Sequence, residues 1–239
     1  MEQLTKAPNE FGYILDNIKE IRDRVGNAAA KYRKPGDRID IMAVTKTVEP
    51  EKVNFAVSQG ITLLGENRVQ EYLSKKDSYD SLASVHIIGH LQTNKVKYII
   101  DCVDMIQSVD SLKLANEIER LASARGKIMD ILIEVNIGDE ATKSGISSEE
   151  LFELAKRVSE LEHLRIRGLM AIPPIGCGGD VFAAIHELYL KLGELDPARI
   201  RPDTLSMGMS GDYELAIEHG SNLVRIGTKL FGARKYLEV

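Results

Sequence analysis

One lysine stands at a position in this chain where it could act chemically. Lys46 follows the apolar run 41–44 and precedes Pro50, so it lies where a buried strand gives way to a helix. A lysine is a useful nucleophile only where burial or a neighbouring cation lowers its pKa. A lysine taken alone is more often a solvated residue. The role of Lys46 therefore depends on which groups share its end of the strand.

Two turns late in the chain have the residue types that suit a phosphate group. The segment SMGMSGD (206–212) carries Gly208, Ser210 and Gly211, and RIGTKLFG (225–232) carries Gly227 and Thr228. Small residues in such turns expose backbone N–H groups and hydroxyls to an anion at the start of a helix. The alternative is that these glycines only permit tight turns. An amine that faces a phosphate site is the arrangement that a Schiff-base cofactor requires.

Eight apolar runs alternate with amphipathic segments and would position these groups. The predicted strands are 41–44, 61–64, 85–88, 105–109, 131–137, 164–170, 203–207 and 222–226. Helix starts are indicated by Pro50, by Asp110 and Ser111, and by Ser147 with Glu150 as a capping box. An additional helix is predicted over 8–32, before the first strand, from an apolar stripe at Ile14, Ile18, Ile21 and Val25.

This order of elements predicts an α/β fold, a (β/α)8 TIM barrel with an extra N-terminal helix. The 239 residues suit one such domain over 1–239, with its barrel core over 40–232. A doubly wound open sheet is the alternative, although the chain lacks a glycine-rich first turn. In a barrel of this kind the functional groups lie at the carboxyl ends of the strands, with phosphate often held after strands 7 and 8. Lys46 and both small-residue turns would then share one rim.

Composition narrows the possible functions. The net charge of -5 and the absence of a basic run argue against a general nucleic-acid binder. The start of the sequence lacks the apolar core of a signal peptide, and no stretch approaches the ~20 apolar residues that span a bilayer. Two cysteines give neither a disulfide framework nor metal-ligand spacing. We therefore expect a cytoplasmic protein that binds neither nucleic acid nor membrane.

Two histidines, His86 and His90, are four residues apart and suggest a metal pair. On a strand that spacing separates them by ~13 Å, which is too far to share one ion. His86 is interpreted as structural. For His90, at the carboxyl end of its strand, both a place in the pocket and a place outside it stay open. No metal site is predicted.

Several motifs in consistent order resemble the pyridoxal phosphate homeostasis protein family. They are AVTKTV (43–48), LLGENRVQE (63–71), HIIGHLQTNK (86–95), KSG (143–145) and the long segment 205–232. Members of that family are single-domain barrels similar to the amino-terminal domain of alanine racemase. The resemblance implies that Lys46 forms an aldimine with pyridoxal 5'-phosphate. It also implies that the phosphate is held by Ser210, Gly227 and Thr228, with Arg225 at the pyridine nitrogen and Asn67 beside the ring.

The resemblance implies a protein of intracellular pyridoxal phosphate homeostasis that holds the cofactor without robust turnover. Racemases of this fold add a second domain and a second catalytic base, and here the sequence stops soon after the last barrel motif. No catalytic residue is assigned, because two-sided proton transfer needs a group on each face of the substrate. A weak racemase or lyase is the alternative, and a Schiff-base aldolase acting on a phosphorylated sugar is a third possibility. We expect a monomer that could supply apoenzymes.

Overall fold

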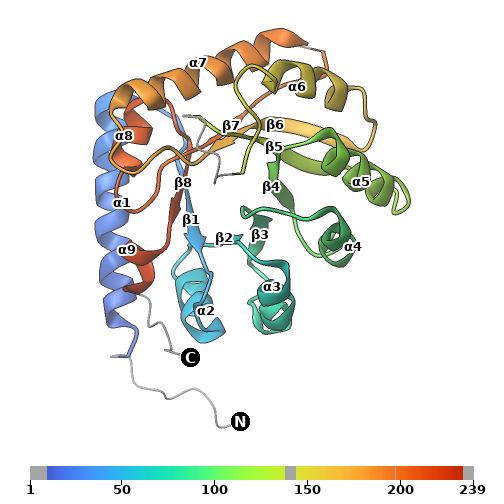
Figure 1. Ribbon diagram of the computed structural model, residues 1–239. Helices are drawn as coiled ribbons and strands as arrows, with labels where there is room; N and C mark the ends of the chain where they lie inside the picture. Colours follow the sequence, from blue (N-terminus) through green and yellow to red (C-terminus); the bar gives the residue numbers. More distant parts are fainter. Residues whose placement is uncertain (1–9, 138–143, 197, 234–239) are drawn as a thin grey trace.

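Eight parallel strands form a closed barrel in the computed structural model, which describes residues 10–137, 144–196 and 198–233. Each strand pairs with the next in the sequence, and β8 pairs with β1 to close the barrel (Figure 1). The strands are β1 (Asp40–Val44), β2 (Leu63–Glu66), β3 (Ser84–Ile87), β4 (Met105–Val109), β5 (Met129–Val135), β6 (Leu164–Ala171), β7 (Thr204–Ser206) and β8 (Leu223–Ile226). The predicted barrel is confirmed, and the open sheet is excluded.

Helices alternate with the strands and cover the outside of the barrel (Figure 1). The α-helices are α1 (Gly12–Tyr32), α2 (Pro50–Ser58), α3 (Val69–Lys75), α4 (Val96–Ile99), α5 (Leu112–Ser123), α6 (Leu151–Ser159), α7 (Gly179–Leu195), α8 (Tyr213–Glu218) and α9 (Thr228–Phe231). Two 3-10 helices, η1 (Lys76–Ser78) and η2 (Thr93–Lys95), complete the described elements.

The extra helix α1 precedes the barrel and packs against α8 and α9 (Figure 1). Its predicted apolar stripe is buried in the main core. The helix begins at Gly12 and not at residue 8: Glu10 and Phe11 lie outside it, and residues 8 and 9 are outside the described residues. Phe11 occupies the N-cap position without a side-chain cap, so no polar group draws the helix further towards the N-terminus.

The predicted helix-start signals operate through different local contacts. Pro50 occupies the first position of α2. The hydroxyl of Ser111 accepts a hydrogen bond from the Leu114 N–H at 3.3 Å, as an N-cap residue does. Ser147 accepts from the Glu150 N–H at 3.3 Å and donates to its carboxylate at 2.8 Å. That box closes a turn ahead of α6, because the α-helix itself begins at Leu151.

Two strands are shifted by two residues from their predicted limits, and the other six differ by at most one residue at either end. The second begins at Leu63 and runs through Gly65 and Glu66, whereas the apolar run suggested 61–64. The fifth ends at Val135, two residues before its predicted end. A glutamate at a strand terminus reads as solvated from sequence, but Glu66 is fully buried. Glu66 can be buried because other segments of the chain supply its hydrogen-bond partners, Thr45 and Tyr79.

The barrel has an apolar outer layer and a mixed interior. Outward-facing strand residues pack with the helices in the main core, whereas Met42, Ile88 and Leu223 form one small interior cluster and Met105, Leu132 and Met170 another. Polar side chains are also buried, among them His86, Gln107, Glu134, Ser206 and Arg225. An eight-stranded barrel is just wide enough for side chains to fill it, so the interior is packed and is not a pore.

In the described part of the chain, no helix is both long enough and apolar enough to cross a membrane. The same residues contain no cluster of three histidine, cysteine, aspartate or glutamate side chains that could hold a metal ion.

Candidate functional site

Lys46 lies two residues beyond the end of β1 and is half-buried. Its neighbours hold the backbone in an unusual shape. Thr45 is fully buried, and Thr47 has a φ of 62°, in the left-handed region that β-branched residues rarely adopt. A conformation of this kind costs about 1–3 kcal/mol and persists only where surrounding contacts fix it. The loop that presents Lys46 is therefore held in place by other parts of the fold.

An ion pair on α3 holds this loop from one side. Glu71 accepts a hydrogen bond from the Thr47 N–H and another from the ammonium of Lys75. Lys75 also donates to the Thr45 carbonyl oxygen at 3.2 Å. The two residues flanking Lys46 are thus bonded to one Glu–Lys pair, which fixes the backbone on both sides of the lysine.

Glu66 also holds this loop, through the side chain of Thr45. Its Oε1 accepts hydrogen bonds from the Thr45 hydroxyl at 2.7 Å and from the Tyr79 hydroxyl at 2.5 Å. Burial raises the pKa of Glu66, and the hydrogen bond from Tyr79 partly offsets that rise. Its other oxygen, Oε2, is buried and has no hydrogen-bond partner among the described residues. The sequence analysis missed Glu66, although it stands within the quoted GENR motif.

The two small-residue turns meet at Ser210. Its hydroxyl accepts a hydrogen bond from the Lys229 N–H at 3.3 Å, which joins the turn after β7 to the first turn of α9. Gly227 occupies the N-cap of α9. Gly208 must be glycine, since its φ is +93° and an added Cβ would lie 2.5 Å from the Cβ of Ala216. The predicted pair of turns thus forms one continuous surface of hydroxyl and backbone groups.

Arg225 lies inside the barrel, beneath these turns. Its N–H donates to the Gly208 carbonyl oxygen at 2.9 Å, and its guanidinium donates to the Ser206 hydroxyl at 2.7 Å and to the Ala171 carbonyl oxygen at 2.8 Å. Among the described residues it forms no ion pair. Burial lowers its pKa to about 10, and the negative charge of Glu134 opposes that shift. Arg225 therefore stays charged at neutral pH although it is held by neutral oxygens.

Asn67 follows β2 directly and is fixed by a close backbone contact. A Cβ on Gly89 would lie 2.3 Å from the Asn67 carbonyl oxygen, so only glycine allows the two segments to approach. The side-chain Oδ1 of Asn67 is buried and has no hydrogen-bond partner within the described ranges. Buried polar atoms are nearly always bonded, so this oxygen has bonding capacity that a ligand could use.

Strand register brings the predicted residues to adjacent strand ends. In the closed barrel Ala43 of β1 pairs with Ile226 of β8, and Val44 pairs with Gly65 of β2. Lys46, the turn at Gly227 and Asn67 therefore follow three neighbouring strands at the same end, and β7 with Ser210 is the fourth. We call the carboxyl ends of β7, β8, β1 and β2, with the turns that follow them, the cofactor rim, after the cofactor that the sequence analysis expects there.

Glu134 is a further buried carboxylate that the sequence analysis missed. It lies on β5, within the apolar run 131–137, and its Oε1 accepts a hydrogen bond from the Ser144 hydroxyl at 2.7 Å. Burial raises its pKa, a rise that the charge of Asp110 reinforces and that of Arg225 opposes. Its Oε2 has no hydrogen-bond partner in the part of the chain that is described. An acidic residue inside an apolar run is the signal that could have identified it.

Other residues considered from the sequence fall outside the four strand ends of the cofactor rim or outside the described residues. His90 has a largely exposed side chain, and its Nδ1 lies 3.5 Å from the Asp110 carboxylate. His86 is buried inside the barrel and bonds to Gln107, as a structural histidine would. Lys143 of the KSG motif is outside the described residues.

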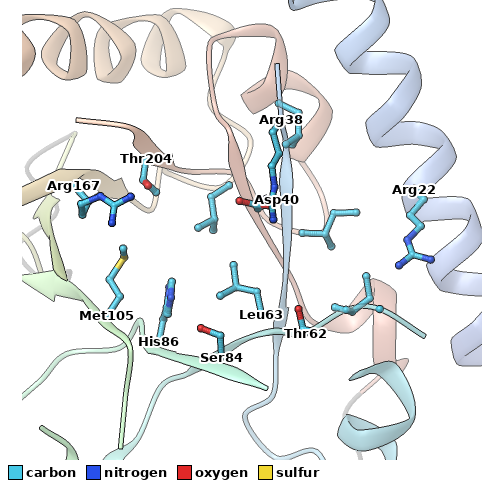
Figure 2. Close-up of a pocket in the computed structure, with 15 residues that line it drawn as sticks. Arg22, Arg38, Asp40, Thr62, Leu63, Ser84, His86, Met105, Arg167 and Thr204 are labelled. Carbon is cyan, nitrogen blue, oxygen red and sulfur yellow. The ribbon is translucent and has the colours of Figure 1, made fainter. Parts of the chain in front are cut away.

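A polar cavity of about 470 Å³ lies at the opposite end of the barrel, where the strands begin. Figure 2 shows Arg38, Arg167, Asp40 and His86 around it. Its arginines are already bonded: Arg167 donates to Asp203 at 3.0 Å and also pairs with Asp130, and Arg38 lies 2.6 Å from Asp40. The third arginine of the lining, Arg22, donates to the Gln59 carbonyl oxygen at 2.8 Å. Because two of its three arginines are paired with carboxylates, this cavity suits a bound phosphate less well than the cofactor rim does.

The comparison with family models matches residues 14–235 to the alanine racemase N-terminal domain. The pyridoxal phosphate homeostasis protein of Aquifex aeolicus (strain VF5) is 40% identical over 224 residues, which covers 92% of this chain and 98% of that protein. PipY of Synechococcus elongatus PCC7942, solved with PLP bound, has a TM-score of 0.77 at 30% identity and covers 92% of this chain and 100% of its own.

An alanine racemase from Clostridium difficile 630 has a TM-score of 0.71 at 18% identity, a likeness that concerns the fold alone. The match covers 94% of this chain but 59% of the racemase. The shared part is therefore the barrel.

Proposed function

The chain belongs to the pyridoxal phosphate homeostasis protein family, and from this premise we propose that it binds pyridoxal 5'-phosphate at the cofactor rim and holds it on Lys46. The function is intracellular pyridoxal phosphate homeostasis, in which the protein acts as a carrier or buffer. When bound, the cofactor supplies an aldehyde that condenses reversibly with a lysine amine. The observation that supports the proposal is the strand order, in which β1, before Lys46, is next to β8 and one strand away from β7, the strands that precede the two small-residue turns.

The residues present fit this cofactor. Ser210, Gly227 and Thr228 offer a hydroxyl-rich and backbone-rich surface for the phosphate. The bond from the Lys229 N–H to the Ser210 hydroxyl is long at 3.3 Å, so a phosphate oxygen could replace either partner at small cost. The buried Oδ1 of Asn67, after the neighbouring strand β2, has no hydrogen-bond partner among the described residues and can accept a hydrogen bond. A polar ring with a phosphate group would satisfy both features.

Arg225 favours holding the cofactor over using it. A guanidinium offers only donors and stays protonated, so it stabilises an unprotonated pyridine nitrogen. Such a ring is a weaker electron sink than one paired with an aspartate. The Ser206 hydroxyl and the Ala171 carbonyl oxygen keep the guanidinium in place without neutralising its charge. This arrangement supports a carrier that protects the aldehyde from other amines.

Absorbance of the purified protein tests the assignment of Lys46. Cofactor-loaded protein is expected to show a visible band that borohydride converts to a reduced species, with the added mass mapped to the peptide containing Lys46. Lys46→Ala should abolish the band, whereas the control Lys52→Ala, on neighbouring α2, should keep it. An unchanged band in Lys46→Ala would refute the assignment. A colourless protein that binds a phosphorylated sugar would favour the aldolase alternative.

A weak racemase or lyase is the second candidate, and one observation favours it. Glu134 is a buried carboxyl group close enough to Arg225 for their charges to interact, and it could move a proton on a second face of a substrate. Incubation with L-amino acids in D2O measures exchange of the α-proton. Sustained exchange above that of free cofactor, lost in Glu134→Gln, would support an enzyme. Exchange at the level of free cofactor supports the carrier.

We extend the proposal to three properties carried over from the sequence: a monomer, a location in the cytoplasm, and supply of cofactor to apoenzymes. Light scattering of the loaded and unloaded protein tests the first. Transfer to an apoenzyme is tested by mixing it with loaded protein and comparing the rate of its activation with that given by the same concentration of free cofactor. A faster rate than release alone allows indicates direct transfer.

A further inference from the structure

A chain of four buried polar side chains crosses the interior of the barrel. Nη1 of Arg225 donates to the Ser206 hydroxyl at 2.7 Å, and that hydroxyl donates to Oε1 of Gln107 at 2.8 Å. Nε2 of Gln107 lies 2.8 Å from Nδ1 of His86. These residues come from β8, β7, β4 and β3, and each is at most 8% exposed. The chain joins the cofactor rim to the opposite end of the barrel.

The donors in this chain all point in one direction. A guanidinium can only donate, so the Ser206 oxygen accepts from Arg225 and its own proton goes to Oε1 of Gln107. The Gln107 amide must then present its NH2 group to His86. Nδ1 of His86 is consequently an acceptor, and the ring carries its proton on Nε2. The charge on Arg225 thus fixes the orientation of every group along the chain.

Burying these polar side chains costs more free energy than filling the barrel interior with apolar side chains would. Side chains of Met42, Met105 and Met170 fill neighbouring interior positions without polar atoms that need partners. A buried glutamine, serine and histidine are tolerated only because each is bonded. None of the three belongs to the predicted cofactor contacts, so the cofactor itself does not explain them.

We propose that Ser206, Gln107 and His86 are positioning residues for Arg225, which fix the direction of its guanidinium towards the ring nitrogen of the bound cofactor. This inference rests on the proposed function for the role of Arg225. The chain leaves Arg225 only the donors not used by Ser206 and Ala171. It also makes the cofactor site sensitive to His86, which lines the cavity at the other end of the barrel (Figure 2).

The surroundings of His86 support a neutral ring. Burial lowers its pKa to about 4, the charge of Asp104 on the loop before β4 opposes that shift, and Arg167 of β6 reinforces it. Met105 and Leu63 are apolar neighbours in the cavity wall (Figure 2). A second proton on the ring would face the NH2 group of Gln107 with a donor, and the chain would have to reverse.

The first experiment uses the protein without cofactor. In ¹⁵N NMR of the histidine ring, His86 is expected to show an unprotonated Nδ1 and a protonated Nε2, unchanged down to about pH 5.5. Gln107→Glu replaces the facing NH2 group with an acceptor, so the ring proton should move to Nδ1 or a second proton should bind. A wild-type ring protonated at Nδ1, or a spectrum unaffected by Gln107→Glu, would overturn the inference.

The second experiment measures the loaded protein. Ser206→Ala is expected to weaken cofactor affinity on the order of tenfold and to shift the wavelength of its visible band, because Arg225 loses one of its two fixed contacts. The control is Ser108→Ala, which removes an equally buried hydroxyl that has no hydrogen-bond partner within the described residues. Equal effects of the two variants on affinity and on the band would reduce the chain to ordinary core packing and overturn the proposal.

The two proposals fail in distinguishable ways. If Lys46→Ala keeps the visible band, the assignment of the cofactor site is wrong, yet the NMR spectrum of His86 still reports whether the chain exists. If Lys46→Ala loses the band while Ser206→Ala and Gln107→Leu leave band and affinity unchanged, the cofactor site stands and the positioning role is refuted.

Discussion

The two ends of the barrel use polar groups in opposite ways. At the end where strands begin, Arg167 is paired with Asp130 and Asp203, and Arg38 with Asp40. At the cofactor rim, Asn67 and Glu66 each keep a buried oxygen without a hydrogen-bond partner among the described residues. The first end uses its charged groups in ion pairs within the fold, and the second keeps hydrogen-bonding capacity that the proposed ligand could use. Unused hydrogen-bonding capacity, rather than the presence of a cavity, distinguishes the proposed binding end.

The largest expected effect is on the stability of the fold, and it comes from a glycine on β6. Gly168 has a φ of +143°, and an added Cβ would lie 1.9 Å from the Thr204 carbonyl oxygen. Gly168→Ala should therefore lower the free energy of unfolding by about 3 kcal/mol or more. Urea denaturation measures the change. The control Gly26→Ala, in α1 with open space around it, should stabilise by about 0.5–1 kcal/mol. Equal stability of the two variants would contradict the account.

A substitution at the cofactor rim should change binding and leave stability alone. Ser210→Ala removes a hydroxyl from the proposed phosphate site, and we expect the dissociation constant of pyridoxal phosphate to rise about tenfold. Equilibrium titration followed by absorbance measures it. Thermal unfolding of the cofactor-free protein should not change. Ser159→Ala, at the end of α6, is the matched control and should bind as the wild type does. Destabilisation without lost affinity would mean that Ser210 supports the fold and does not hold the phosphate.

A substitution at the opposite end of the barrel should lower stability and leave cofactor affinity unchanged. Arg167→Met leaves Asp130 and Asp203 without their shared partner, and we expect a loss of about 1 kcal/mol because the site is partly solvated. Arg165→Met, on the same strand but more exposed and 3.6 Å from Asp130, should cost less. Cofactor affinity, measured in parallel, should stay the same in both. Lost affinity at unchanged stability would break the distinction between the two ends.

The smallest expected effect is a pH dependence that comes from Glu66. Burial raises its pKa in the folded state, so between its unfolded and folded values the folded protein binds more protons. Stability contributed by the protonated form is present at lower pH and is lost as pH rises through the folded pKa. Glu66→Gln should flatten this fall in the free energy of unfolding, measured by urea denaturation across pH 4–7. The predicted direction would be contradicted if the free energy of unfolding of the wild type rose with pH and Glu66→Gln removed that rise.

The fold and part of the site could be predicted because they depend on local patterns. Apolar runs place eight strands in order, and the rule that function lies at strand ends places Lys46 and Ser210 on one rim. The supporting residues could not be predicted in the same way. Gln107 and Ser206 bond across 99 sequence positions, and the positive φ of Thr47 is fixed by Glu71 on α3. Such contacts exist only after the barrel has closed, so the sequence signals no more than a polar residue inside an apolar run.

The pairing of β8 with β1 has a consequence for when the protein can begin to work. The cofactor rim lies across this seam, and its residues come from both extremes of the barrel sequence, Lys46 early and Arg225 late. During synthesis most of the remaining chain must therefore emerge and dock before Lys46 gains the phosphate site proposed for it. A partly made chain offers only a solvated amine. If the cofactor is held at this rim as proposed, its capture requires a closed barrel, and its binding then favours the completed fold by mass action.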